Sequence, residues 1–86
     1  MKISVELTLT PLQDDYEPAI INFIKRLRAS GFSVLENPLS TQVYGDYDKV
    51  MALLQKEMKI ALEAIERGLL YIKIVKSDRS DYEPTF

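Results

Sequence analysis

Cysteine and histidine are both missing from the 86-residue sequence. Their absence excludes disulfides, zinc sites of the usual Cys/His kind, thiol nucleophiles and Ser-His-Asp triads. Acid–base chemistry would fall to Asp, Glu, Lys or Tyr side chains. The sequence therefore predicts a protein without a metal site and without these common catalytic sites.

Long apolar runs are also lacking. No segment approaches the ~20 apolar residues that a membrane-spanning helix needs. The N-terminal stretch carries Glu6 where a signal peptide would be apolar. We therefore expect a cytoplasmic protein that does not enter a membrane.

Charge of one sign does not dominate any part of the chain. The 11 basic and 13 acidic residues are mixed and give a net charge of −2. Because no basic stripe exists to neutralise phosphates, nucleic-acid binding is not expected.

What is present is the composition of one globular domain, with 47% hydrophobic and 28% charged residues. A chain this short buries only ~60–65% of its unfolded surface. Since self-association buries more surface, we expect a homodimer or a homotetramer.

Hydrophobic periodicity predicts four strands and two helices. The residues from Ile3 to Leu9 alternate between apolar and polar, which is typical of a half-buried strand. Two later segments show an apolar stripe at helical spacing instead, and Gly31 and Gly68 are expected to end these helices. The predicted strands are 2–9, 32–37, 41–45 and 69–75, and the predicted helices are 18–30 and 46–67.

The order strand-helix-strand-strand-helix-strand is the ferredoxin-like βαββαβ plan of the α+β class. It predicts an antiparallel four-stranded sheet in the order 4-1-3-2, with both helices on one face. We expect the domain to span residues 1–76. Residues 77–86 are polar, and we expect them to form a poorly ordered C-terminal tail.

The sheet face away from the helices is predicted to be chemically mixed. Such a face can form a wet interface with a second copy or line a polar pocket. It can also face water, with Glu6 and Lys73 as an ordinary cross-strand pair. The predicted residues of this face are Ser4, Glu6, Thr8, Tyr71, Lys73 and either Gln42 or Tyr44.

Residues 37–47 gather hydroxyl, amide and phenol side chains around a turn. Asn37 and Pro38 predict the turn, residues 41–44 predict a strand, and Asp46 predicts a helix cap. Polar side chains that converge at such a junction can bind a small ligand. They can also simply satisfy the backbone of the turn, which the residue types alone favour.

These motifs resemble those of a known family. Residues 1–7 (Met-Lys-Ile-Ser-Val-Glu-Leu), a Pro-Leu loop, and Asn-Pro-Leu-Ser-Thr-Gln-Val-Tyr-Gly-Asp before a long helix are similar to the small YkoF-like proteins. Those proteins bind thiamine or its hydroxymethylpyrimidine moiety. The resemblance covers residues 1–76. It implies a ferredoxin-like fold, dimers or tetramers, and non-catalytic binding of a thiamine-type ligand, with no further cofactor.

The resemblance also implies a ligand site. Ser40 and Thr41 would hold the pyrimidine by hydrogen bonds. Glu6 would balance the positive charge of the thiazolium, and a ring from Tyr44 or Tyr47 would pack on it. The full set of predicted ligand-binding residues is Ser4, Glu6, Asn37, Ser40, Thr41, Gln42 and Tyr44.

The same fold serves other functions. An acylphosphatase-like enzyme needs a phosphate cradle after the first strand, whereas residues 11–16 are acidic and lack glycine. RNA recognition needs stacking aromatics on the two central strands, where only Tyr44 is found. The alternative that stays open is a regulatory or assembly domain whose open sheet face forms an oligomer interface without a ligand.

Overall fold

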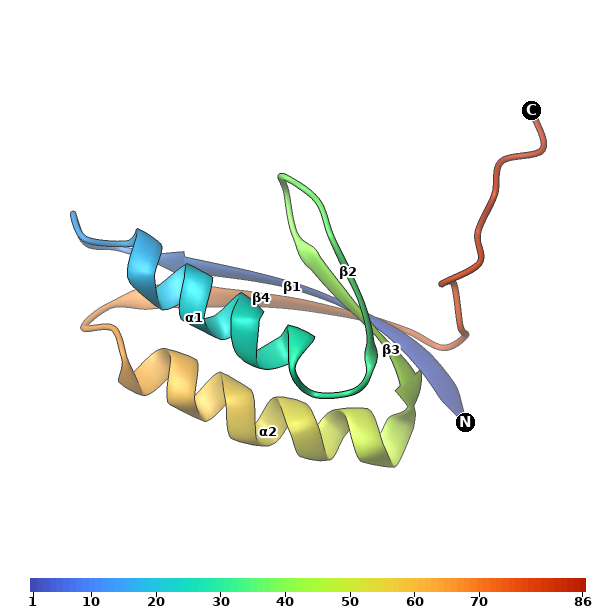
Figure 1. Ribbon diagram of the computed structural model, residues 1–86, viewed down its shortest axis with the longest axis horizontal. Helices are drawn as coiled ribbons and strands as arrows, with labels where there is room; N and C mark the ends of the chain where they lie inside the picture. The colour runs from blue at the N-terminus through green and yellow to red at the C-terminus, as the bar shows by residue number, and fades with distance from the viewer.

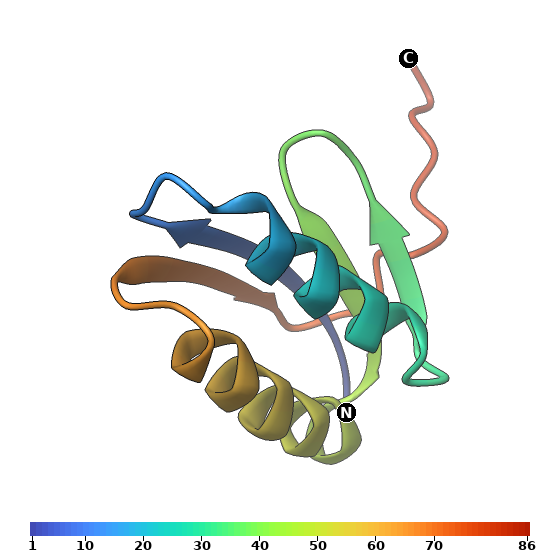
Figure 2. The same ribbon diagram turned by 60° about the vertical axis from the view of Figure 1, so that its left-hand side comes forward.

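The computed structural model describes residues 1–86 and has six regular elements (Figure 1). In chain order they are β1 (Lys2–Pro11), α1 (Glu17–Arg28), β2 (Ser33–Glu36), β3 (Thr41–Asp46), α2 (Tyr47–Glu63) and β4 (Gly68–Val75). Neighbouring strands are antiparallel, and the sheet order is β2-β3-β1-β4. Both helices cover the same face of the sheet (Figure 2). The predicted ferredoxin-like α+β fold and its strand order are confirmed.

β1 is a central strand, and its alternating pattern builds the core. Val5 lies opposite Val43 of β3 and Ile74 of β4. The inward side chains of β1 join residues of β3 and of both helices in one buried cluster. Full burial of each large apolar side chain contributes ~1.5–3 kcal/mol to stability. The cluster contains Ile3, Val5, Leu7, Leu9, Phe23, Leu27, Val43, Val50, Leu54 and Ala61.

α2 buries a carboxylate within its apolar stripe. Glu57 lies one turn from Leu54 and Ala61 and is only 6% exposed. It accepts a hydrogen bond of 2.7 Å from Nε of Arg26 on α1. This carboxylate can be buried because α1 packs against α2 and brings the guanidinium of Arg26 to it.

α2 ends at Glu63, before the predicted end at residue 67. Gly68 does not end the helix but opens β4, opposite Pro11. A Cβ atom at Gly68 would lie 2.9 Å from the carbonyl oxygen of Thr10 and would collide with the side chain of Ile65. The glycine therefore permits the close approach of β4 to β1. Neither helix has the length and apolarity that crossing a membrane requires.

Asp46 stands at the N-cap of α2 as predicted, but its side chain makes no capping hydrogen bond. The N–H of Tyr47 donates instead to the carbonyl oxygen of Met1 at 2.8 Å. The carboxylate of Asp46 lies 3.4 Å from the N-terminal ammonium. Desolvation acts to raise the Asp46 pKa, but the hydrogen bond and charge of the ammonium prevail and lower it.

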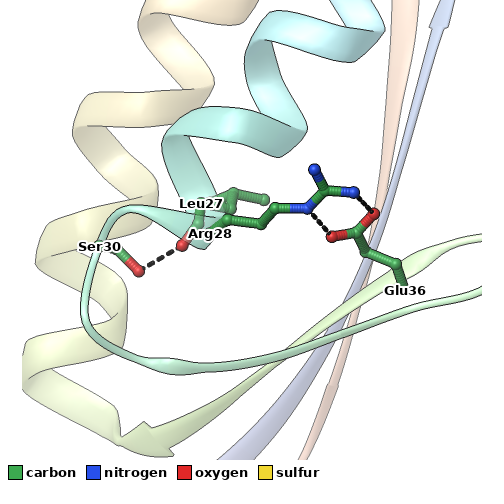
Figure 3. A network of polar contacts seen from close by, with 4 residues as sticks. All are labelled: Leu27, Arg28, Ser30 and Glu36. Carbon is green, nitrogen blue, oxygen red and sulfur yellow. Dashed lines mark hydrogen bonds and ion pairs between the residues drawn. The ribbon is translucent and has the colours of Figure 1, made fainter.

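An ion pair joins the end of α1 to the end of β2 (Figure 3). Arg28 donates through Nε and Nη2 to the two carboxylate oxygens of Glu36, and the Nη2 bond measures 2.6 Å. This hydrogen bonding lowers the pKa of Glu36. Ser30 Oγ donates to the carbonyl oxygen of Leu27 at 2.5 Å, and Gly31 then turns the chain with a left-handed φ of +86°. Glu36 directly precedes the turn of residues 37–40, so the ion pair holds the start of this turn close to the end of α1.

The beginning of the C-terminal segment is tied to the sheet by Ser4. The hydroxyl of Ser4 donates to the carbonyl oxygen of Ser77 at 2.7 Å and accepts from the N–H of Arg79 at 2.8 Å. Beyond this anchor the chain leads away from the body, and Phe86 is fully exposed (Figures 1 and 2). The predicted tail thus starts inside a hydrogen-bonded segment, and the division at residue 76 stays a prediction.

Candidate functional site

A cavity of about 190 Å³ lies where β1 loses its pairing with β3. β3 pairs with β1 only as far as Leu7 opposite Thr41, whereas β4 continues to Pro11 opposite Gly68. The turn of residues 37–40 closes the free edge of β1. We call this cavity the slot; it is lined by residues 7–9 of β1, by Ile20, Phe23 and Ile24 of α1, and by residues 37–41.

The turn that borders the slot is held by its own hydrogen bonds. Asn37 Oδ1 accepts the N–H groups of Leu39 and Ser40 at 2.9 and 3.0 Å, and the N–H of Asn37 donates to the carbonyl oxygen of Ser40. Thr8 Oγ1 on β1 donates to the carbonyl oxygen of Leu39 at 3.3 Å. The Asn37 oxygen thus provides an acceptor for the backbone N–H groups of the turn. The Leu39 side chain stays 84% exposed at the rim of the slot.

Thr41 is a buried residue that lines the slot. It lies at the start of β3, between Leu7 of β1 and Glu36 of β2, on the helix-covered face of the sheet. Thr41 is only 5% exposed, and its hydroxyl makes no hydrogen bond within the protein. The hydroxyl oxygen is not one of the fully buried polar atoms that lack a partner, so water can reach it through the slot. A ligand in the slot could therefore bond to the Thr41 hydroxyl in place of water.

Ser40 turns its hydroxyl toward the open face of the sheet, which is the face without helices. Gln42 Nε2 donates to Ser40 Oγ at 2.5 Å, and Ser40 Oγ donates to Glu6 Oε2 at 2.9 Å. Glu6 and Gln42 lie opposite each other on β1 and β3. The other amide atom, Gln42 Oε1, is buried and has no partner.

A second cavity of about 150 Å³ lies on this open face. Its lining includes Glu6, Gln42 and Tyr44 together with Lys73 and Arg79. Glu6 lies opposite Lys73 in the β1–β4 register, but the two side chains form no ion pair. The cross-strand pair that the sequence allowed is therefore not formed, and the carboxylate bonds to Ser40 instead.

Relatives of this chain are found among known proteins. A sequence model described as thiamine-binding protein matches residues 5–86. The chain belongs to this family. The match includes residues 77–86, for which the sequence motifs offered no counterpart. A comparison with proteins of curated function found no significant match.

Solved structures share the fold of this thiamine-binding family member. A protein from Streptococcus pneumoniae has a TM-score of 0.83 at 22% identity, covering 94% of this chain and 92% of that one. A proposed thiamine biosynthesis/salvage protein from Thermotoga maritima has a TM-score of 0.80 at 19% identity, and the match covers 90% of this chain and 85% of that one. A de novo designed protein reaches 0.60 at 7% identity, covering 90% and 99%. Such similarities show the fold alone, so function has to be argued from the site.

In this thiamine-binding family member the predicted ligand residues fall into two groups. Asn37, Ser40 and Thr41 line the slot, and all of the others line the open-face cavity. Only the hydrogen bonds of Ser40 to Glu6 and Gln42 connect the groups. The set that lines the open-face cavity is Ser4, Glu6, Gln42 and Tyr44.

Several residues of the slot were not among the predicted ligand residues. Phe23 and Ile20 have the spacing of ordinary core positions of α1, although they also form one wall of the slot. Thr8 was predicted on the open face, and its bond to Leu39 shows that it reaches the turn as well. The signal that was available in the sequence was the hydroxyl at Thr8, close to the end of the first strand.

Proposed function

We propose that the protein binds thiamine, or its hydroxymethylpyrimidine moiety, in the slot and does not transform it. The family supports a thiamine-type ligand. The observation that carries the proposal is the Thr41 hydroxyl, which lies in the slot on a buried residue and has no partner. The polar groups around it are hydroxyls and an amide, and such groups recognise an aminopyrimidine by hydrogen bonds.

The size and the walls of the slot favour the pyrimidine ring over the whole ligand. Its volume of about 190 Å³ lies below the ~300–1,000 Å³ of pockets for drug-sized molecules. Phe23 and Ile24 offer apolar walls to a flat ring. We therefore place the pyrimidine inside the slot and the thiazolium at its rim, beside the exposed side chain of Leu39.

The test is isothermal titration calorimetry with thiamine and with free hydroxymethylpyrimidine. Thr41→Val keeps the shape of the side chain and removes the hydroxyl, so it should weaken both ligands by about fivefold, corresponding to ~1 kcal/mol. Thr10→Val is the matched control, because Thr10 lies on β1 and lines neither cavity. Failure of both ligands to bind at millimolar concentration would refute the proposal. If the Thr41→Val and Thr10→Val variants bind the ligands equally well, the Thr41 hydroxyl does not contact the ligand.

We also propose that the open face associates with a second copy of the chain. This face exposes Tyr71, Leu35 and Leu69, and Tyr71 is 64% exposed. A partner could also supply a donor to the unpaired Gln42 Oε1. Light scattering at tens of micromolar should then give a dimer or a tetramer. A mass of 9.9 kDa would instead show a monomer and contradict this assignment.

A further inference from the structure

We infer that the free edge of β4 pairs with β4 of a second copy of the chain, in antiparallel orientation and with Ile72 on the two-fold axis. The paired strands would join the two sheets into one. This edge is a different surface from the open face, and the inference does not depend on the thiamine binding proposed above.

β4 is a long edge strand of the sheet. It pairs with β1 from Gly68 to Val75 and stands last in the strand order β2-β3-β1-β4. Apart from the local bond of the Ser77 N–H to the Val75 carbonyl oxygen, no backbone bond joins another segment to its outer edge. Such an edge carries N–H and C=O groups that are ready to pair with another strand, so proteins usually shorten or block it.

The opposite edge of the sheet is blocked in this way. β2 has only four residues, and Pro38 follows it closely. Arg28 holds the carboxylate of Glu36 at the end of this strand. β4 has eight residues and a single charged one, Lys73, so it lacks comparable protection.

β4 also exposes apolar side chains on the face that the helices cover. Ile72 and Ile74 are 42% and 46% exposed, although Leu7 and Val5, which lie opposite them on β1, are buried. The helices therefore leave the outer side of β4 partly uncovered. A further strand would cover these side chains, because neighbouring strands lie only ~4.8 Å apart.

The residue pattern of β4 is self-complementary in one register. Residues directly opposite each other on antiparallel strands point to the same face of the sheet. When Ile72 lies opposite the partner's Ile72, Leu70 meets the partner's Ile74 on the face of the helices. On the open face, Lys73 meets the partner's Tyr71, whose ring can pack against the lysine side chain.

The two neighbouring registers are less favourable. One of them places Lys73 opposite the partner's Lys73, and like charges directly opposite each other are destabilising. The other places Ile74 opposite the partner's Gly68, which offers no side chain for contact. Apolar contact and charge therefore favour the pair centred on Ile72.

A second copy fits this edge better than an unrelated peptide does. In a two-fold pair the same surface is used twice, so each β4 supplies the strand that the other lacks. Residues 69–75 of the two strands would face each other and form about six to eight backbone hydrogen bonds. Both open faces would then point the same way, which leaves the open face free for the association proposed above.

The first experiment uses the absence of cysteine from the chain. Ile72→Cys places one thiol on the two-fold axis, so mild oxidation should link two copies into a covalent dimer on a non-reducing gel. Ile21→Cys is the matched control, because Ile21 is an isoleucine of α1 with 46% exposure. It should give roughly tenfold less covalent dimer, since disulfides need Cβ atoms within about 4.5 Å of each other. Equal linking by the two variants would overturn the pairing.

Tyr71→Cys tests the register. Its thiols would lie diagonally across the two strands, about 7–8 Å apart, and should link more slowly than those of Ile72→Cys. Faster linking by Tyr71→Cys would place the axis at Tyr71 and overturn the proposed register.

Analytical ultracentrifugation then separates this edge from the open face. Ile72→Lys brings like charges together on the axis and should raise the dissociation constant of the edge pair at least ~10-fold, whereas Ile21→Lys should leave it unchanged. Leu35→Lys changes only the open face and should leave the edge pair intact. If Leu35→Lys dissociates the protein completely while Ile72→Lys has no effect, the edge pairing is overturned and the open-face association stands.

A measurement on the wild-type protein covers the case in which the variants do not fold. Amide hydrogen exchange at alternate residues of β4 should slow as the protein concentration rises, because only the N–H groups of the outer edge gain partners. Exchange in β4 that is independent of concentration would overturn the inference, and it would leave the proposed thiamine binding untouched.

Discussion

The ion pair between Arg26 and Glu57 gives the sharpest prediction about stability. Glu57 is almost fully buried between the two helices, and Arg26 Nε lies 2.7 Å from its Oε2. Arg26 Nη2 is also buried and already lacks a partner. Loss of the carboxylate would therefore leave a guanidinium with no acceptor in the helix interface.

The magnitude depends on how far Arg26 can escape to water. Loss of one partner from a fully buried ion pair costs about 3–5 kcal/mol. Because the Arg26 side chain keeps 28% of its surface exposed, we expect a smaller loss of about 2–3 kcal/mol for Glu57→Ala. Glu57→Gln keeps an acceptor but loses the charge, which should cost about 1 kcal/mol. Domains of this kind have a total stability of only about 5–15 kcal/mol, so both losses are measurable.

The assay is urea unfolding followed by far-UV circular dichroism, with Glu63→Ala as the exposed control on the same helix. The midpoints should shift while the denaturant slope stays constant. The double variant Arg26→Met, Glu57→Leu should recover most of the loss, because apolar residues of similar volume can replace a buried ion pair. If Glu57→Ala loses no more stability than the control, or if the double variant loses the sum of the single losses, our assignment of the ion pair is wrong.

Three further predictions concern single contacts. The Arg28 hydrogen bond lowers the Glu36 pKa, so its stabilising effect is complete above the ordinary value of 4.5 and is lost as the pH falls through the lowered folded value. Unfolding curves of Glu36→Gln should therefore depend less on pH in this acidic range, and an unchanged dependence would contradict the pair. Gly68→Ala should lower stability by about 1–3 kcal/mol in thermal unfolding, because its Cβ would press on the Thr10 carbonyl oxygen. A Gly68→Ala variant as stable as the wild type would contradict this close approach. Ser4→Ala should speed proteolytic removal of residues 77–86, and equal cleavage rates would show that the anchor has no effect.

The sequence by itself determined the strands and their order. Apolar residues at every second position of β1 allow one face only to be buried, since a shift by one residue would expose all of them. The short link between residues 36 and 41 requires an antiparallel hairpin, and the two helices supply the long connections. These are local properties of the chain, so the pattern of residues is enough to predict them.

Tertiary contacts decided the details that local patterns do not express. The apolar stripe of α2 could not show that Glu57 is buried, because the reason is Arg26 on another helix. The early end of α2 and the glycine at residue 68 depend on how closely β4 approaches β1. The N-cap of α2 is completed by Met1, which lies far away in the sequence.

The candidate site also combines features that the sequence determines with features that only the tertiary structure decides. Ser40, Thr41 and Gln42 form one cluster in the sequence, but successive side chains of a strand point to opposite faces. Thr41 therefore lies under the helices, while Gln42 lies on the open face with Glu6. The slot exists because β4 follows β1 further than β3 does. That difference involves three segments far apart in the sequence, so only the folded structure could bring it about.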